Sequence, residues 1–153
     1  MPAIEKLFRT ELRQLAFDPK RESFLVDTGT VETTVALDLL HKVFNGRVRV
    51  TLLPSTTRRR KGVFLPTSLE NELCRGLRNF LEDEDVHPRF PVLMATIPEE
   101  MILAYAKRRK LSGTTLAPRD DVREMLEHLQ AAQPQTKSAL RKSLEWLKTR
   151  KDV

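Results

Sequence analysis

The stretch of residues 46–66 constrains the fold more than any other part of the chain. Three apolar residues, Val48, Val50 and Leu52, alternate with polar residues, which is the period of a half-buried strand. Residues 63–65 are a second short run of strand-forming side chains. Only a polar connector that ends in glycine separates the two runs. The pattern therefore predicts a two-stranded antiparallel ribbon, a basic β-hairpin.

Cationic side chains dominate this predicted hairpin. Its polar face and its tip carry six of them, with no carboxylate between residues 47 and 61: Arg47, Arg49, Arg58, Arg59, Arg60 and Lys61. Guanidinium groups pair with phosphate oxygens, and neutralising a phosphate releases its counterions. The cluster predicts a nucleic-acid partner, DNA or RNA, held through its phosphate backbone. The alternative is a solvated loop that keeps the protein soluble.

A second basic run lies at residues 107–110, at the end of a predicted helix over 98–110: Lys107, Arg108, Arg109 and Lys110. Cations at a helix C-terminus stabilise the helix by about 0.3–1 kcal/mol each, which explains the run without a ligand. The functional alternative is a second contact with nucleic acid, and the case for it improves only if the run and the hairpin tip share one face.

Helical and strand periodicities along the rest of the chain indicate an α+β fold. The predicted strands form a small mixed or antiparallel sheet of residues 23–27, 47–53, 62–65 and 92–97. Helices over 31–45, 67–83 and 98–110 are expected to cover this sheet, after an amphipathic N-terminal helix over 2–17. A helical pair, 119–132 and 136–151, closes the chain. We expect residues 1–153 to form one domain. The alternative is an α+β body to which residues 119–153 are attached as a small helical appendage.

Composition narrows the class of protein and of partner. The net charge of +6 and the pI of about 9.8 favour a polyanionic partner, and no apolar run reaches the roughly 20 residues of a membrane span. A single cysteine, Cys74, forms no internal disulfide and favours an intracellular location, cytoplasmic or nuclear/nucleoid. We expect no membrane partner.

The last helix offers an alternative function, docking to another protein. Trp146 projects away from the leucine seam of this helix, beside Lys142 and Arg150. A tryptophan outside the main apolar stripe anchors a partner in many interfaces, although it also packs under neighbouring helices. These three residues are the candidate partner-binding set of an adaptor or of a subunit of a nucleoprotein complex.

Two short motifs resemble parts of enzyme families. Asp27-Thr28-Gly29 resembles the catalytic loop of retroviral-type aspartic proteases, but that family continues with strands and a glycine flap. A helix is expected after this triplet, so we interpret it as a strand-to-helix turn. Strands that end near Asp27 and Glu99 resemble the PIN-type ribonucleases, which implies a third alternative, a metal-dependent nuclease.

Neither the histidines nor Cys74 has the spacing of metal ligands, and no glycine-rich phosphate loop is present. The sequence therefore predicts no catalytic residue, no metal site and no cofactor. The leading hypothesis is a non-enzymatic nucleic-acid-binding protein, either an accessory or a regulatory subunit.

Overall fold

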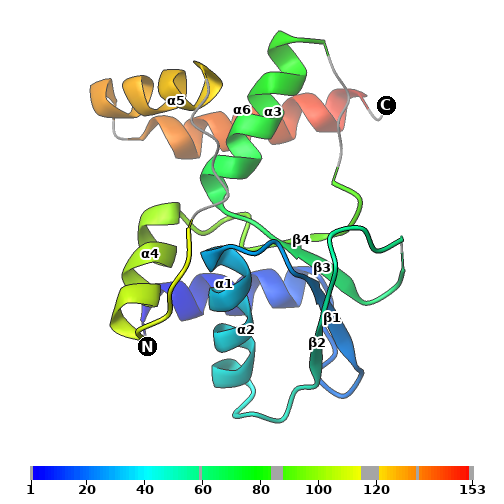
Figure 1. Cartoon of the computed structure of the whole chain (residues 1–153). Helices are drawn as coiled ribbons and strands as arrows, with labels where there is room; N and C mark the ends of the chain where they lie inside the picture. The colour runs from blue at the N-terminus through cyan, green and yellow to red at the C-terminus, as the bar shows by residue number, and fades with distance from the viewer. Residues whose placement is uncertain (1, 59, 84–87, 115–120, 134, 152–153) are drawn as a thin grey trace. The chain divides into compact units, whose positions relative to one another are not determined.

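A computed structural model describes residues 2–58, 60–83, 88–114, 121–133 and 135–151, and only the backbone of residues 147–151 (Figure 1). Six helices are found in this part of the chain, close to the helices predicted from periodicity: α1 Ala3–Gln14, α2 Val31–Val43, α3 Leu69–Leu81, α4 Glu99–Arg108, α5 Asp121–Ala132 and α6 Thr136–Lys151.

The four strands form one all-parallel sheet in the order β2-β1-β3-β4. Their bounds are β1 Ser23–Val26, β2 Val50–Leu53, β3 Val63–Pro66 and β4 Val92–Leu93. The fold is therefore α/β and Rossmann-like. The prediction of an α+β fold with a mixed or antiparallel sheet is wrong.

The predicted hairpin is also wrong, because β2 and β3 do not pair with each other. Strand β1 lies between them and pairs with both in parallel, with Ser23 opposite Val50 and Phe24 opposite Val63. Two parallel strands are usually joined by a crossover connection of a dozen or more residues. The connector between β2 and β3 has only nine residues, 54–62, and this short length is why the sequence pattern predicted a hairpin. Strands of only four residues are short enough for this connector to run back along the sheet without a helix.

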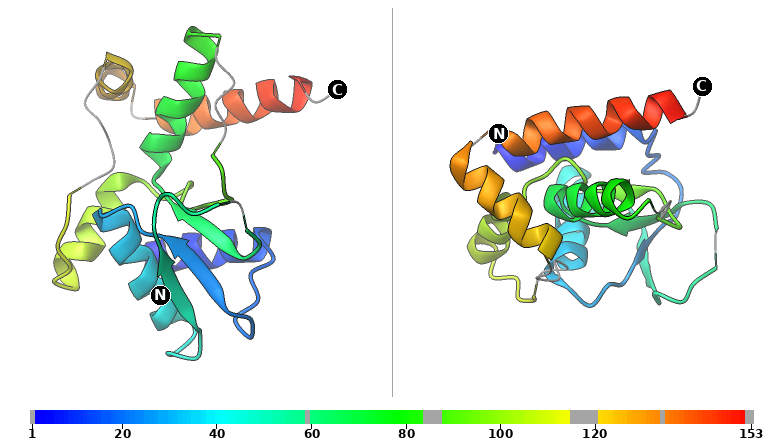
Figure 2. Two further views of the ribbon diagram at one scale, coloured as in Figure 1. Left: turned by 45° about the vertical axis from the view of Figure 1, so that its right-hand side comes forward. Right: turned by 90° about the horizontal axis from the view of Figure 1, so that it is seen from above.

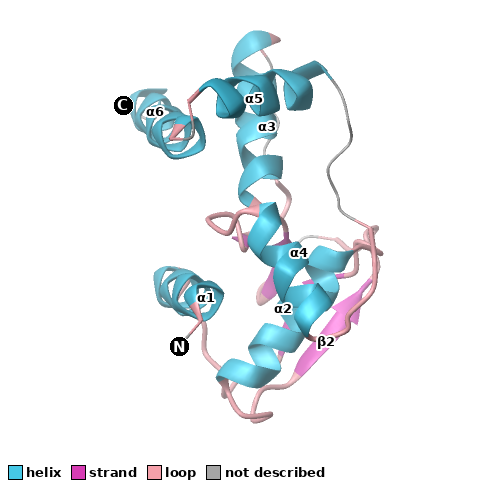
Figure 3. Ribbon diagram, turned by 90° about the vertical axis from the view of Figure 1, so that its left-hand side faces the viewer, coloured by secondary structure: helices cyan, strands magenta, loops and turns pink. Residues whose placement is uncertain are grey.

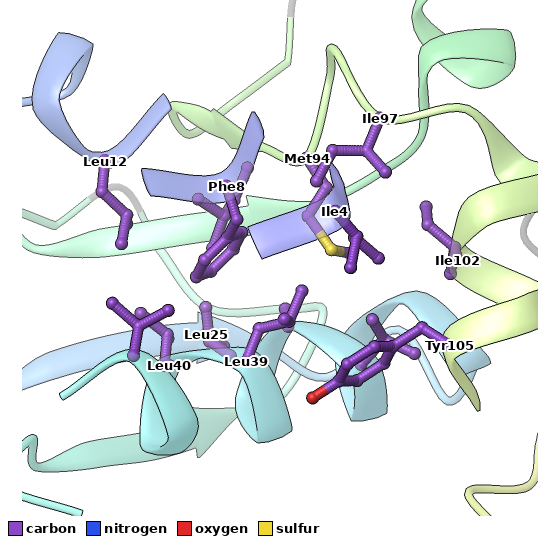
Figure 4. Close-up of a cluster of buried hydrophobic side chains, with 14 of the residues drawn as sticks. Ile4, Phe8, Leu12, Leu25, Leu39, Leu40, Met94, Ile97, Ile102 and Tyr105 are labelled. Atoms are coloured by element: carbon purple, nitrogen blue, oxygen red, sulfur yellow. The ribbon is translucent and has the colours of Figure 1, made fainter. Parts of the chain in front are cut away.

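One face of the sheet carries the main hydrophobic core. Leu25 and Phe64 point to this face and pack with buried side chains of α1, α2 and α4 (Figure 4). These three helices lie on one side of the strands (Figure 3). In α1 the core-facing residues Ile4, Phe8 and Leu12 recur at helical spacing, as the amphipathic pattern predicts.

The chain divides into two compact units: a sheet unit of Met1–Leu69 with Pro88–Leu116, and a helical unit of Glu70–His87 with Ala117–Val153. The sequence placed α3 over the sheet, but α3 groups with the C-terminal helical pair. Inside the helical unit, Gly76 of α3 lets Leu144 of α6 approach closely, and Lys137 forms an ion pair with the buried carboxylate of Glu70 over 2.9 Å. One domain over 1–153 stays a prediction.

The described helices include none that is both long and apolar enough to span a membrane.

Candidate functional site

The strand order places a candidate site at the carboxyl ends of β1 and β3. From β1 the chain continues to β2 on one side, and the next strand, β3, lies on the other side of β1. In open parallel sheets, ligands bind in the crevice outside the carboxyl ends of the strands, at the point where the order reverses in this way. The turn that follows Val26 and the residues that follow Pro66 meet at this edge.

The turn between β1 and α2 is fixed by its own side chains. The Asp27 carboxylate accepts a hydrogen bond from the Gly29 amide over 2.9 Å, and Gly29 has a φ of 70° that favours glycine. The Thr28 hydroxyl lies 2.6 Å from that of Thr30 and 2.7 Å from that of Thr33. Three hydroxyl groups therefore gather at the amino end of α2.

Another part of the sheet unit covers the first amide of α2. The Val31 amide donates a hydrogen bond to the Thr114 carbonyl over 2.8 Å. A Cβ atom added to Gly113 would stand 3.0 Å from the Val31 nitrogen, so only glycine allows this close approach. The amino end of α2 attracts anions through its dipole, and here the segment 111–114 occupies part of it.

A carboxylate from α1 binds the loop that follows β4, at the carboxyl end of this strand. Glu11 is buried and accepts hydrogen bonds from the Met94 amide over 2.7 Å and from the Thr96 amide over 2.8 Å. The Thr96 hydroxyl adds a third bond at 2.9 Å. The hydroxyl residues Thr67 and Ser68, directly after β3, are buried beside this loop. Sequence reading identified the turn at 27–30 but none of these partners, because they come from distant segments.

The cations of the predicted hairpin lie on the β2–β3 connector and just before β2. Arg58, Arg60 and Lys61 are exposed, and Arg59 lies outside the described residues. Arg47 and Arg49 are exposed as well. Within the described parts of the chain, none of these five cations forms an ion pair with a carboxylate; the Arg60 guanidinium lies over the Phe24 ring, 4.2 Å from its centroid.

The run at the end of α4 lies away from this connector. The two basic segments are on opposite sides of the sheet unit in both Figure 1 and the right-hand view of Figure 2. Arg108 lies over the Tyr105 ring, 5.7 Å from its centroid. The two segments therefore lie on different faces of this unit, and a nucleic-acid contact by residues 107–110 stays a prediction.

Within this run, Arg109 is engaged by Asp38 of α2. Arg109 donates hydrogen bonds to the Asp38 carboxylate over 3.1 and 3.3 Å, and the Tyr105 hydroxyl donates a third. Burial alone raises the pKa of Asp38, but the bonds from Arg109 and Tyr105 outweigh it and leave the pKa below its usual value. Lys107 and Lys110 remain as exposed cations of the run.

The candidate partner-binding residues lie on α6. Trp146 is 56% exposed and Lys142 is also exposed. The side chain of Arg150 lies outside the described residues.

Cys74 lies buried in α3, and burial raises the pKa of its thiol. In the described ranges, no group of three His, Cys, Asp or Glu side chains is placed to hold a metal ion. Asp27 and Glu99, the two acids named for the nuclease alternative, therefore belong to no such group among these residues.

Comparison with known proteins gives a fold neighbour but no family. No family model matches the chain, and neither does any curated protein sequence. Among solved structures, the chain is similar to the U34-tRNA thiolase NcsA from Methanococcus maripaludis with its [4Fe-4S] cluster, at a TM-score of 0.70 and 14% identity. The match covers 94% of this chain and 77% of NcsA.

The match contradicts the prediction of a protein without catalytic activity, because NcsA is an enzyme. It also gives no support to the predicted function of a non-enzymatic binder or an adaptor. The thiolase cluster, however, does not fit this chain. A [4Fe-4S] cluster is held by several cysteine thiolates, and this sequence has one cysteine, which is buried in a helix. What the chain shares with NcsA is its fold.

Proposed function

We propose that this chain acts on RNA and that its substrate is a tRNA. The observation that carries the proposal is the fold match to a U34-tRNA thiolase over 94% of the chain at a TM-score of 0.70. The net charge of +6 supports it, because a tRNA is a polyanion. DNA has no such support. A tRNA substrate and a chain with one cysteine agree with an intracellular location.

The proposed reaction site is the carboxyl edge between β1 and β3. Thr28 and Thr30 supply hydroxyl groups there, and the amino end of α2 favours a negatively charged group of the substrate. Glu11 holds the β4–α4 loop at the same edge, so the site is formed by fixed turns. The chain's own residues would bind and orient the reacting group, without a resident iron–sulfur cluster, since the cysteine ligands are lacking.

A binding panel at several salt concentrations tests the proposal. Labelled tRNA transcript, single-stranded RNA and duplex DNA of similar length are titrated with the full chain. We expect tRNA to bind most tightly, with an affinity that falls steeply as salt rises. Equal affinity for duplex DNA, or no retention of tRNA at low salt, would contradict the proposal.

The proposed site is tested separately with Thr28→Val and Thr30→Val. Each change removes a hydroxyl from the edge and keeps the shape of the side chain. We expect tRNA binding to change little, because each variant keeps every cationic side chain of the protein. The modification of tRNA bases, measured by mass spectrometry of the nucleosides, should be reduced. Unchanged modification in both variants would place the reaction at another site.

A further inference from the structure

The connector between β2 and β3 occupies a face of the sheet that a crossover helix covers in most parallel sheets. The connector must return from the carboxyl end of β2 to the amino end of β3, since both strands run parallel to β1. The side chains on this second face form a small cluster of Val26, Val63 and Phe90, with Phe24 packed against it. A polar, basic segment therefore runs along an apolar face.

Arg60 lies over this face. Its guanidinium carbon lies 4.2 Å from the centroid of the Phe24 ring, within the range of a cation–π contact. The connector is fixed beside this contact, because the Phe24 amide donates to the Gly62 carbonyl over 2.8 Å. Arg60 is exposed as a residue, although its guanidinium lies over the aromatic ring.

Further cations lie just before β2 and β3. Arg49 comes one residue before β2 and Lys61 two residues before β3, and both strands pair with β1 at its start. The two residues therefore stand on either side of Glu22, about two strand spacings or 10 Å apart. The Glu22 carboxylate accepts a hydrogen bond from the Thr51 hydroxyl over 3.2 Å. Arg49 and Lys61, together with the exposed Arg47, Arg58 and Arg60 of the same two segments, are named the connector surface below.

We propose that this connector surface binds an unpaired segment of RNA. Phosphates would pair with Arg49, Arg58 and Lys61, and a base would stack on the guanidinium of Arg60. Unpaired bases stack on arginine planes and on aromatic rings, whereas bases inside a duplex are not accessible to them. The inference rests on the proposed function and deepens it, because it names the surface and the single-stranded class of RNA.

A matched pair of double variants tests the phosphate contacts. Arg58→Ala with Lys61→Ala removes two exposed cations from the connector surface, and Lys107→Ala with Lys110→Ala removes two from the opposite side of the same unit. We expect the connector variant to bind tRNA about 10- to 100-fold more weakly near 0.1 M salt. Its log–log salt slope is expected to fall by about 1.4, the value for two single-stranded phosphates, while the control variant changes affinity less than about threefold.

A single substitution tests the stacking. Arg60→Lys keeps the charge and removes the planar group, so we expect the salt slope to stay and the affinity to fall about tenfold. An unpaired RNA oligonucleotide with 2-aminopurine reports stacking directly, because its fluorescence is quenched when the base stacks. Quenching is expected with the wild-type chain and not with Arg60→Lys; equal quenching in both would overturn the stacking role of Arg60.

The outcomes separate this inference from the function on which it rests. If tRNA binds the wild-type chain and both double variants lose affinity equally, the connector surface is wrong and the proposed function stands. If the wild-type chain retains no RNA, both fail. Thermal melting of each variant shows whether a loss of affinity comes from unfolding.

Discussion

Replacing Glu11 by alanine should destabilise the sheet unit strongly. The Glu11 carboxylate is buried and accepts three hydrogen bonds, from the Met94 amide at 2.7 Å, the Thr96 amide at 2.8 Å and the Thr96 hydroxyl at 2.9 Å. These bonds tie α1 to the β4–α4 loop, which borders the proposed reaction site. Glu11→Ala leaves the two amides without this acceptor.

The size of the effect follows from the number and the type of bonds. Hydrogen bonds to a charged group contribute about 1.5–3 kcal/mol each, so three give an upper range of roughly 4.5–9 kcal/mol. Water that enters the space left by the side chain can bond to the freed amides, which restores part of this free energy. Removing one partner of a buried charged network typically costs about 3–5 kcal/mol, and we expect a loss in this range. For a chain of this length, that corresponds to a drop in Tm of about 6–20 °C.

Urea unfolding followed by circular dichroism measures the free energy of unfolding directly. The control is Glu22→Ala, the same substitution at an exposed residue with one side-chain hydrogen bond, which should cost less than about 1 kcal/mol. Glu11→Gln keeps one acceptor oxygen and should fall between the two. A loss below about 1 kcal/mol for Glu11→Ala would refute the reasoning, since the three bonds would then contribute no net stability.

Three further predictions concern other parts of the chain. The pKa of Asp38 is lowered in the folded state, so its contribution to stability is present above its usual pKa and is lost as pH falls below about 4; urea midpoints should show wild type and Asp38→Asn converging there, and a constant difference would contradict this. Gly113→Ala places a Cβ atom 3.0 Å from the Val31 nitrogen at a φ of 148°, so we expect a loss of about 1–3 kcal/mol and faster hydrogen exchange at the Val31 amide; unchanged exchange would show that the contact is not maintained. Anaerobic incubation with iron and sulfide should leave the protein without bound cluster, because the sequence has one cysteine; a stoichiometric [4Fe-4S] absorbance would contradict this.

The helices could be predicted from the sequence because each carries its signal locally. Ile4, Phe8 and Leu12 mark α1 by spacing alone, and Gly46 has the left-handed φ of 74° expected after α2. These signals depend on neighbours a few residues apart. The ends of the helices agree with the prediction to within a few residues.

The sheet could not be predicted because strand pairing joins distant segments. The alternation of Val48, Val50 and Leu52 indicates a strand but not its partner or its direction. The short connector favoured a hairpin, whereas β1, far earlier in the chain, pairs between the two strands. A parallel sheet also forms its ligand crevice from the ends of separate strands, so the order of the strands had to be known before the site.

In the candidate site, too, local features could be predicted from the sequence and contacts between distant segments could not. Asp27, Thr28 and Gly29 could be recognised as a turn from the sequence. The contact of Val31 with Thr114 and the bonds of Glu11 to the β4–α4 loop join residues that are more than 80 positions apart. The exposure of Arg58, Arg60 and Lys61 was expected from composition, but the position of Arg60 on Phe24 depends on the parallel sheet.

The most direct test of the central claim identifies the RNA that the protein contacts in cells. Full-length protein is crosslinked to RNA by ultraviolet light, purified under denaturing conditions, and the attached RNA is sequenced. We predict strong enrichment of tRNA over its share of total RNA, and loss of that enrichment when Arg58, Arg60 and Lys61 are replaced by alanine. Recovery of cellular RNAs in simple proportion to their abundance, unchanged by these substitutions, would contradict it.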